Sequence, residues 1–498
     1  MEFTAHNAAT GEALAPAYRD ASAHEIAAVA TAANDAFEPY AALGAARHAA
    51  FLETIAEVLL ARSGPLLERA GLETGLPPGR LENERNRTVA QLRLFAALAR
   101  EGSWIDARID TAQPDRKPQA RPDLRRMLLP LGPVAVFGAS NFPFAYSVAG
   151  GDTTSALAAG NPVVVKAHPA HPGTSDLTAE IIRVAIAQSG VPAGVFGMVH
   201  GASPDVSLAL VRHPAIAAVG FTGSLRAGRA LFDAAAARPV PIPVFAEMGS
   251  VNPVFVLPGA LAERGPALAE GLVGSFTLGV GQFCTKPGLV LGVDSPAWET
   301  FARDVATRAA AVPPGVMLHA GIAGAFARSV ADLREVEWLV QGGARIARVA
   351  GARFLARPEL AHEIFGPYTL MITARDFAEL TAIAGRLEGQ LTASVHGTAA
   401  ELTQAHALLT MLARRAGRVV CNGFPTGVEV VPAMNHGGPY PATTDSRFTS
   451  VGTAAIFRFA RPVCYQNFPD ALLPVELQRA NPRQLLRLVD GQLTRDAR

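Results

Sequence analysis

The chain has 498 residues, of which 49% are hydrophobic and 17% are charged. This length allows two or three domains with full cores, and the composition is that of a compact globule, which excludes a disordered or fibrous chain. The net charge of +1 gives no reason to expect nucleic acid or a membrane surface as partner. There is no membrane-length apolar run, no signal-peptide pattern and no disulfide framework among three cysteines, so a cytoplasmic location is expected.

The first hundred residues predict a short hairpin followed by helices. Residues 3–18 are expected to form the hairpin, and Ser22 and Glu25 have the spacing of a capping box that opens a helix to about Phe37. Residues 106–126 are polar and rich in Arg and Pro, which predicts an extended arm or hairpin outside the core. Between these segments, apolar residues at helical spacing predict three further helices, at 43–61, 64–75 and 77–101.

From residue 131 the chain alternates between short apolar strands and helical segments. Such alternation predicts a parallel sheet covered on both faces, which is a Rossmann-like cofactor-binding domain built from residues 1–105 and 127–247. The expected strands are 132–139, 161–167, 194–200, 216–223 and 241–247, with helices at about 145–159, 173–189, 203–211 and 224–237. Ligands of these sheets bind at the carboxyl ends of the strands, where the sequence places Asn141, Lys166, Gly223 and Glu247.

A glycine turn supplies the most direct sign of a nucleotide. The GxGxxG fingerprint is absent after the first strand, but GFTGSLRAG at 220–228 places glycines at the start of a helix. Free amides and the helix dipole favour a phosphate at such a turn. A tight strand–helix turn without a ligand explains the same pattern, so both interpretations stay open.

Residues 248–435 predict a second α/β domain, and GQFCTKPG at 281–288 is its most informative stretch. Cys284 lies between glycine-bearing turns, where a thiol can be open to a small molecule, and a thiolate is a strong nucleophile. A cysteine packed in the core is the alternative. Cys421 and Cys464 match no catalytic motif and are expected to pack in the core. The histidines show no metal-ligand spacing, so no metal is predicted.

Lysine is scarce in this chain. Only Lys117, Lys166 and Lys286 are lysines among the 44 basic side chains. Where arginine carries almost all the charge, a retained lysine favours a role for its compact ammonium group, which the wide arginine fork cannot replace. This argument favours a function for Lys166, in an apolar strand, and extends to Lys286, two residues after the cysteine.

Six motifs resemble, in order and spacing, the aldehyde dehydrogenase superfamily over nearly the whole chain. They are SNFPF (140–144), VVVKAHPA (163–170), GFTGS (220–224), EMGSVNP (247–253), GQFCTKPG (281–288) and EIFGP (363–367). The segments 82–88, 387–398 and 437–474 resemble the α-ketoglutarate semialdehyde (2,5-dioxopentanoate) dehydrogenase branch. Two departures from the family pattern are Lys286, where a smaller polar residue is expected, and EMGS in place of ELGG.

The resemblance implies an NAD(P)-dependent oxidation of an aldehyde to a carboxylic acid. Cys284 would attack the carbonyl to give a thiohemiacetal, and hydride transfer would leave a thioester. The side-chain amide of Asn141 and the backbone N–H of Cys284 would stabilise the oxyanion, and Glu247 would activate water. The alternatives are a turn asparagine and an ion-paired or helix-capping glutamate. Substrates kept open are 2,5-dioxopentanoate, a fatty or aliphatic aldehyde, and a semialdehyde whose acyl group passes to CoA; a protein that kept the fold without activity is a further alternative.

The resemblance also implies a nicotinamide cofactor, with NADP preferred and NAD still usable. A carboxylate that repels a 2′-phosphate is absent, because Lys166 is followed by Ala167, His168 and Pro169, and protonated His168 with a helix start near Gly173 would attract the phosphate. The cofactor residues implied are Ser140, Lys166, His168, Gly223, Ser224, Glu363 and Phe365.

The residues that would bind the substrate are predicted from fewer observations. Arg87 and Gln91 are four residues apart on one predicted helix face, so both can point into one channel and hold a 2-oxo acid, with Phe142 beside them. Arg447 is a second candidate, and an exposed arginine is the alternative for each. The 106–126 arm and residues 445–498 are expected to form an oligomerisation element, so the partners predicted are an aldehyde and further copies of the chain, as a homodimer or homotetramer.

Overall fold

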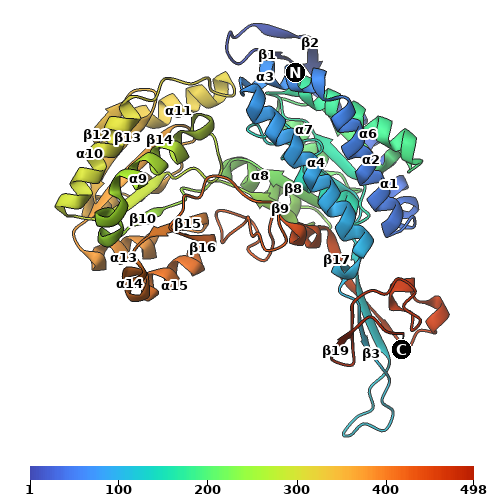
Figure 1. Ribbon diagram of the computed structural model, residues 1–498. Coiled ribbons are helices and arrows are strands. Elements are labelled where there is room, and N and C mark those ends of the chain that lie inside the picture. Colours follow the sequence, from blue (N-terminus) through green and yellow to red (C-terminus); the bar gives the residue numbers. More distant parts are fainter. Residues whose placement is uncertain (498) are drawn as a thin grey trace.

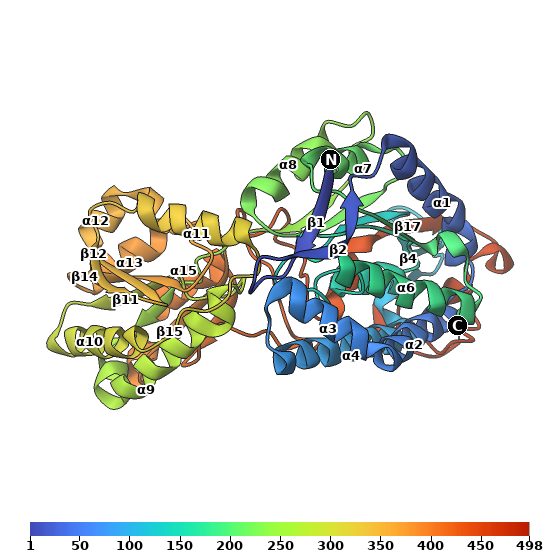
Figure 2. The same cartoon turned by 90° about the horizontal axis from the view of Figure 1, so that it is seen from above.

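The computed structural model describes residues 1–497 and consists of two α/β units and a narrow β arm (Figure 1). One unit contains a five-stranded sheet, the other a seven-stranded sheet, and the arm a second five-stranded sheet. Figure 2 shows the two units side by side. The predicted α/β class, with a Rossmann-like unit, a second α/β unit and a β arm, is therefore confirmed. None of the helices in residues 1–497 is long and apolar enough to span a membrane.

The sheet of the first unit is parallel throughout, in the order β7-β6-β5-β8-β9. Its strands are β5 (Val134–Phe137), β6 (Val163–Lys166), β7 (Phe196–Val199), β8 (Ala218–Thr222) and β9 (Val244–Glu247). The apolar, β-branched runs of β5, β6 and β9 are buried at every residue, as strands covered on both faces must be. Strand order reverses at β5, so the carboxyl ends around it form the edge at which ligands of such sheets bind.

Helices cover both faces of this sheet. The connecting helices are α5 (Gly151–Ala158), α6 (Pro172–Ser189), α7 (Pro204–Arg212) and α8 (Leu225–Ala236). Four N-terminal helices pack with them after the hairpin of β1 (Glu2–His6) and β2 (Ala13–Arg19): α1 (Ala23–Ala41), α2 (Ala45–Ala61), α3 (Ser63–Thr74) and α4 (Pro78–Glu101). The capping box of Ser22 and Glu25 is present at the start of α1, as predicted.

The helix predicted at 145–159 begins only at Gly151, and the turns before it are held by a buried carboxylate. Glu84 of α4 accepts hydrogen bonds from the backbone N–H groups of Phe144 and Ala145, at 2.9 and 3.0 Å. Both hydrogen bonds hold residues 144–145 in the turn that precedes α5. The contact matters for the site because it fixes the turn that follows β5 and carries Asn141.

The second unit has a sheet in the order β12-β13-β14-β11-β10-β15-β16, in which only β12 runs antiparallel to its neighbour. Its strands are β10 (Val254–Val256), β11 (Leu289–Val293), β12 (Glu337–Gln341), β13 (Arg345–Ala350), β14 (Tyr368–Ala374), β15 (Gln390–His396) and β16 (Ala416–Cys421). The covering helices are α9 (Pro258–Thr277), α10 (Pro296–Ala310), α11 (Ala320–Asp332), α12 (Gly351–Ala356), α13 (Phe377–Arg386), α14 (Ala399–Gln404) and α15 (His406–Arg415).

The arm pairs segments from distant parts of the chain. Its strands are β3 (Arg108–Asp110), β4 (Leu124–Pro130), β17 (Ala460–Gln466), β18 (Arg487–Val489) and β19 (Gln492–Thr494), in the order β17-β4-β3-β18-β19. Figure 1 shows this sheet extending away from the first unit. The expected homodimer or homotetramer stays a prediction.

The prediction that Cys421 and Cys464 pack in the core is wrong, because both side chains are exposed. Cys421 ends β16 and Cys464 lies in β17, and each of these strands is at the edge of its sheet. Alternate residues of an edge strand with one open face point to solvent. An apolar residue type in a strand-like run therefore did not imply burial.

Candidate active site

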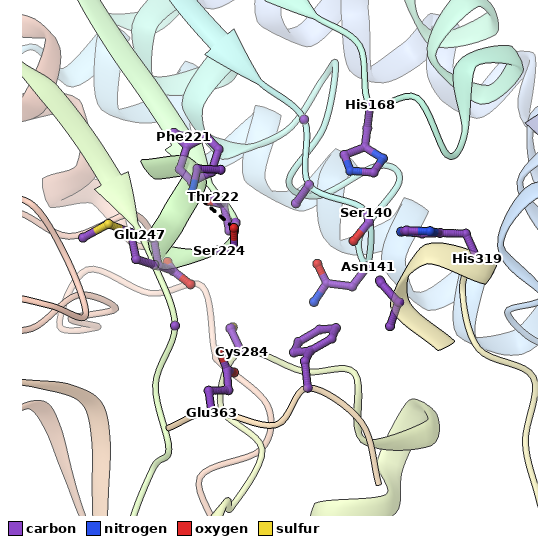
Figure 3. A pocket seen from close by; sticks show the side chains of 18 residues that line it. Ser140, Asn141, His168, Phe221, Thr222, Ser224, Glu247, Cys284, His319 and Glu363 are labelled. Carbon is purple, nitrogen blue, oxygen red and sulfur yellow. Dashed lines mark hydrogen bonds between the residues drawn. The ribbon is translucent and has the colours of Figure 1, made fainter. Parts of the chain in front are cut away.

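The predicted residues come together at one cavity of about 370 Å³ at the carboxyl edge of the parallel sheet (Figure 3). It is lined by Ser140, Asn141, His168, Gly223, Ser224, Glu247, Cys284, Glu363 and Phe365. His319 and Ile322, from the start of α11, also line it and were not predicted. The cavity thus receives side chains from both α/β units. Lys166 and the predicted substrate residues lie outside its lining.

The turn before Cys284 has an unusual backbone. Gly279, Val280 and Gly281 all have positive φ, of 55°, 58° and 66°. This conformation is rare for a β-branched residue such as Val280, so the surrounding structure must hold it in place. A side chain at Gly281 would place its Cβ 2.3 Å from the carbonyl of Gly366. The turn that carries Cys284 is therefore packed directly against the segment that carries Glu363 and Phe365.

Asn252 holds the cysteine in this turn. Its side-chain amide donates to the carbonyl oxygens of Cys284 (2.8 Å) and Lys286 (3.0 Å). Its amide oxygen accepts from the hydroxyls of Thr392 (2.9 Å) and Ser250 (3.0 Å), so this buried side chain is fully hydrogen-bonded. Asn252 lies in the EMGSVNP motif, and the sequence indicated no role for it. Its contacts with two distant segments form only in the folded chain.

Cys284 faces two groups that can move protons. Its Sγ lies 3.4 Å from Nε2 of His436, and the same nitrogen lies 3.0 Å from Oε1 of Glu247. The hydroxyl of Ser450 donates to the other oxygen of Glu247 at 2.5 Å. His436 and Ser450 are buried and were missed by the sequence analysis. The only signal available was the position of NHGG at 435–438, within and beside the segment that carried the branch resemblance.

The segment 436–451 reaches this position by crossing back from the second unit to the first. Thr443 forms an isolated β-bridge with Glu247, the last residue of β9. The backbone N–H of Met248 donates to the carbonyl of Ala442 at 2.7 Å. The end of β9 is therefore extended by a strand-like pairing with the C-terminal part of the chain, which brings His436 and Ser450 to the carboxylate.

The electrostatics of this group favour an ionised base beside a protonated thiol. Burial pushes the pKa of Glu247 upward, but His436, Ser450 and the thiol outweigh it, so the pKa lies below its usual range. Burial and the charge of Glu247 both raise the pKa of Cys284 well above that of a free thiol. A proton must therefore leave Sγ when the thiol attacks, and acceptors lie in contact with it. Glu247, Cys284 and His436 each offer one atom that lies within 4.8 Å of the other two. The prediction of no metal remains untested.

Asn141 lies on the opposite side of the cavity from Glu247 (Figure 3). Its side-chain amide donates one hydrogen bond to the carbonyl of Gln282, at 3.0 Å. An amide nitrogen carries two hydrogens, so the second remains free to donate. The arrangement ties the turn after β5 to the turn of the other unit that carries Cys284.

The substrate residues of α4 lie against an aromatic cluster. Nη2 of Arg87 donates to the hydroxyl of Tyr146 at 3.3 Å, and its guanidinium lies 5.9 Å from the centre of the Phe142 ring. The Tyr146 ring is in turn 6.5 Å from that of His436. Gln91 is buried and its amide nitrogen has no hydrogen-bond partner among residues 1–497. Arg87 is thus connected to the surroundings of His436 through the Tyr146 ring.

The structure changes which of two other arginines is a candidate for the site. Arg447 is 78% exposed and forms an ion pair with Asp445, so the structure does not bring it to the site. Arg418 in β16 was not predicted. Burial lowers the pKa of Arg418, and the thiol of Cys284 and the phenol of Tyr146 would oppose that effect in their ionised forms. Its guanidinium is held by the carbonyls of Pro425 and Gly427.

The predictions that protonated His168 and the helix start near Gly173 would attract a 2′-phosphate are wrong. Burial, together with His171, Lys166 and His319, lowers the pKa of His168 well below its usual value, so His168 is neutral near pH 7. The helix start near Gly173 is already occupied, because Glu73 accepts from the backbone N–H groups of Gly173 and Thr174, both at 2.8 Å. A buried carboxylate on α3 has taken the place that an anionic ligand would need.

Lys166 and the glycine turn at 220–228 lie at the ends of strands, as predicted from the sequence. Lys166 ends β6 and is 8% exposed, and burial lowers its pKa to about 8. Gly223 lines the cavity, and the Ser224 hydroxyl accepts from the backbone N–H of Ala227 as the N-cap of α8. Gly223, Ser224 and Ala227, at the start of α8, all line the cavity, and a helix N-terminus suits a phosphate.

A family model described as "Aldehyde dehydrogenase family" matches residues 1–351. The chain belongs to the aldehyde dehydrogenase family. It is 51% identical to alpha-ketoglutaric semialdehyde dehydrogenase 2 of Azospirillum brasilense, over 96% of this chain and 93% of that protein. It is 47% identical to an alpha-ketoglutaric semialdehyde dehydrogenase of Acinetobacter baylyi, with the same shares covered.

Solved aldehyde dehydrogenases share the fold. The NADP-dependent glyceraldehyde-3-phosphate dehydrogenase of Bacillus halodurans, complexed with NADP, superposes with a TM-score of 0.79 over 94% of this chain and 95% of that one, at 21% identity. Membership in the family makes the chain an NAD(P)-dependent aldehyde dehydrogenase. The predicted family and reaction class are therefore confirmed. The roles of the individual residues remain to be tested.

Proposed function

We propose that this aldehyde dehydrogenase oxidises 2,5-dioxopentanoate (α-ketoglutarate semialdehyde) to 2-oxoglutarate with a nicotinamide cofactor. The observation that carries the proposal is an arginine, Arg87, that bonds to Tyr146, has no carboxylate partner in contact among residues 1–497, and opposes the rise in the pKa of Cys284. The names of the relatives that are 51% and 47% identical support the same substrate. The test is formation of 2-oxoglutarate from 2,5-dioxopentanoate, with and without CoA, because a CoA requirement would instead indicate acyl transfer.

The chain's own residues account for the covalent steps. Cys284 attacks the aldehyde carbon while its proton passes to Nε2 of His436 or to Glu247, and the free N–H of Asn141 with the backbone N–H of Cys284 stabilises the resulting oxyanion. A nicotinamide cofactor would supply the hydride acceptor, and Ser140, Gly223, Ser224, Glu363 and Phe365 line the cavity that would hold it. Glu247 then removes a proton from water, which attacks the thioester and releases Cys284.

Arg87 and Arg418 bring positive charge from different units of the structure. Arg87 comes from α4 of the first unit, and Arg418 comes from β16 of the second. Both charges act on Cys284, since Arg87 lowers the pKa of the thiol and the thiol raises that of Arg418. A substrate with a carboxylate at the far end from its aldehyde would offset both charges. A neutral aliphatic aldehyde would leave them uncompensated.

Replacing Arg87 with methionine is expected to lower kcat/KM for 2,5-dioxopentanoate by about 10- to 100-fold, which is the range for losing a hydrogen bond to a charged group. Activity with hexanal should stay within about twofold, because hexanal has no carboxylate to bind. Arg93→Met is the matched control, since Arg93 is exposed on the same helix. An equal loss with both aldehydes would show that Arg87 only supports the fold of the site.

We also propose that the cofactor is NADP in preference to NAD. Pro169 follows the strand lysine where a carboxylate would repel a 2′-phosphate, and Lys166 keeps a positive charge at pH 7. His168 is neutral and the start of α6 is occupied, so neither attracts the 2′-phosphate. The expected preference for NADP is therefore modest. The kcat/KM ratio of the two cofactors at saturating aldehyde measures it.

Pro169→Glu is the companion variant for this preference, and it is expected to shift the cofactor ratio toward NAD by about tenfold through repulsion of the 2′-phosphate. Pro169→Gln, which adds similar bulk without charge, is the control. A parent enzyme that is as efficient with NAD would refute the preference. An unchanged ratio in Pro169→Glu would place the selectivity outside this turn.

A further inference from the structure

Lys286 is a lysine in a place where an ammonium group is costly. It follows the nucleophile by two residues and is 1% exposed. A buried charge persists only where hydrogen bonds or opposite charge replace water. The mechanism above makes no use of this group, so its partners indicate what it does.

The ammonium of Lys286 is bound to the neighbouring cofactor segment. Its Nζ donates to the carbonyl oxygens of Ile364 (2.9 Å) and Tyr368 (3.0 Å) and lies 5.9 Å from the centre of the Tyr368 ring. These two carbonyls flank the stretch that begins with Phe365. A single side chain therefore fixes both ends of the turn whose residues Glu363 and Phe365 line the cavity.

The charge of Lys286 also acts on Glu363. Burial raises the pKa of the Glu363 carboxyl, and the Lys286 ammonium opposes that rise. Burial lowers the pKa of Lys286, and Glu363 opposes that fall. In Figure 3 Glu363 lies on the same side of the cavity as Cys284. The lysine thus supplies the counter-charge that helps a largely enclosed carboxyl stay ionised.

The same turn is already in contact, through backbone atoms, with the turn that carries Cys284. Gly281 packs against the carbonyl of Gly366, and Asn252 fixes the carbonyl of Lys286 itself. The base of the lysine is therefore anchored with Cys284, and its tip is anchored in the 363–368 segment. Because Nζ is compact, it can donate to two carbonyls that approach each other closely, which a planar guanidinium fits poorly. This accounts for a lysine in a chain with 44 basic side chains of which three are lysine.

We propose that Lys286 is a positioning residue. It holds the Glu363–Phe365 turn, and with it the nicotinamide end of the cofactor, at a fixed position relative to the thiol of Cys284. The proposal rests on the proposed use of this cavity by a nicotinamide cofactor. It assigns a role to a residue that is a departure from the family pattern. Its effect should be on cofactor binding and hydride transfer, with little effect on the thiol or on aldehyde binding.

The test uses Lys286→Met, which keeps the length of the side chain and removes its charge and donors. The dissociation constant of the oxidised cofactor, measured by titration without aldehyde, is expected to rise about tenfold or more, because two charge-assisted hydrogen bonds are lost. The kcat should fall, and the KM for aldehyde should stay within about twofold. The rate at which iodoacetamide alkylates Cys284 without cofactor should also stay within about twofold, since Glu247 and His436 are untouched.

Two further variants keep the result decisive. Lys117→Met, at an exposed lysine on the arm, is the matched control and should behave as the parent. Lys286→Gln keeps donors for the carbonyls without the charge, and a loss of about threefold or more in cofactor affinity is expected; if Lys286→Met fails to fold, this value decides. Parent-like cofactor affinity in the folded variants would overturn the proposal. A parent protein that binds neither NAD nor NADP would instead overturn the proposed function.

Discussion

Replacing Cys284 with alanine is expected to abolish aldehyde oxidation, with a loss of at least about four orders of magnitude in kcat, while the cofactor still binds. An aldehyde carbon can give up a hydride only after it becomes tetrahedral, and the thiol supplies the fourth bond. Removal of a nucleophile in comparable covalent enzymes produces losses of this size. Cofactor reduction at saturating aldehyde measures the effect, and titration of the free enzyme measures binding.

The matched control is Cys421→Ala, which removes an exposed thiol at the edge of the second sheet. This variant should have parent activity. Substantial cofactor reduction by well-folded Cys284→Ala protein would mean that another group, or water, adds to the aldehyde. The nucleophile would then have to be sought elsewhere in the cavity.

Glu247→Gln is expected to separate the two halves of the reaction. The amide cannot remove a proton from water, so hydrolysis of the thioester should slow by about 10²- to 10⁴-fold, as for the loss of a general base. The first half should survive because Nε2 of His436, 3.4 Å from Sγ, can still accept the thiol proton. Rapid mixing should therefore show a burst of reduced cofactor equal to the enzyme concentration, followed by slow turnover.

His436→Gln is the informative comparison for this experiment, because it removes the imidazole and leaves the carboxylate. We expect it to slow the burst more than Glu247→Gln does. If Glu247→Gln loses the burst as well, the carboxylate takes the thiol proton itself and His436 serves to orient it. The relative burst rates of the two variants therefore distinguish a proton relay from direct abstraction.

The parallel sheet and the positions at its edge could be predicted because they depend on local patterns. Buried apolar runs such as the one in β6 have few alternatives; Glu247 ends β9, and Asn141 lies in the turn after β5. The motif around Cys284 was similarly local. Glycine and proline marked the turns, which placed the strand bounds within a few residues of those observed.

The contacts that complete the site were not predictable because they join distant segments. Glu247 and Ser450 are 203 residues apart along the chain, and Cys284 and His436 are 152 apart. No pattern within either segment encodes the pairing. The occupied start of α6 is a similar case: the sequence correctly indicated that a helix begins there, but Glu73, from a helix about a hundred residues earlier, already binds its first amides.

The return crossing of residues 436–451 has a consequence for biosynthesis. Cys284 and the whole parallel sheet leave the ribosome long before His436 and Ser450 do, because a chain is made from its N-terminus. A nascent chain that ends before residue 436 contains the thiol and the carboxylate at the end of β9, but neither the imidazole nor the hydroxyl that contact Glu247. The imidazole and the hydroxyl therefore reach Glu247 only after the C-terminal part of the chain has been made and has docked.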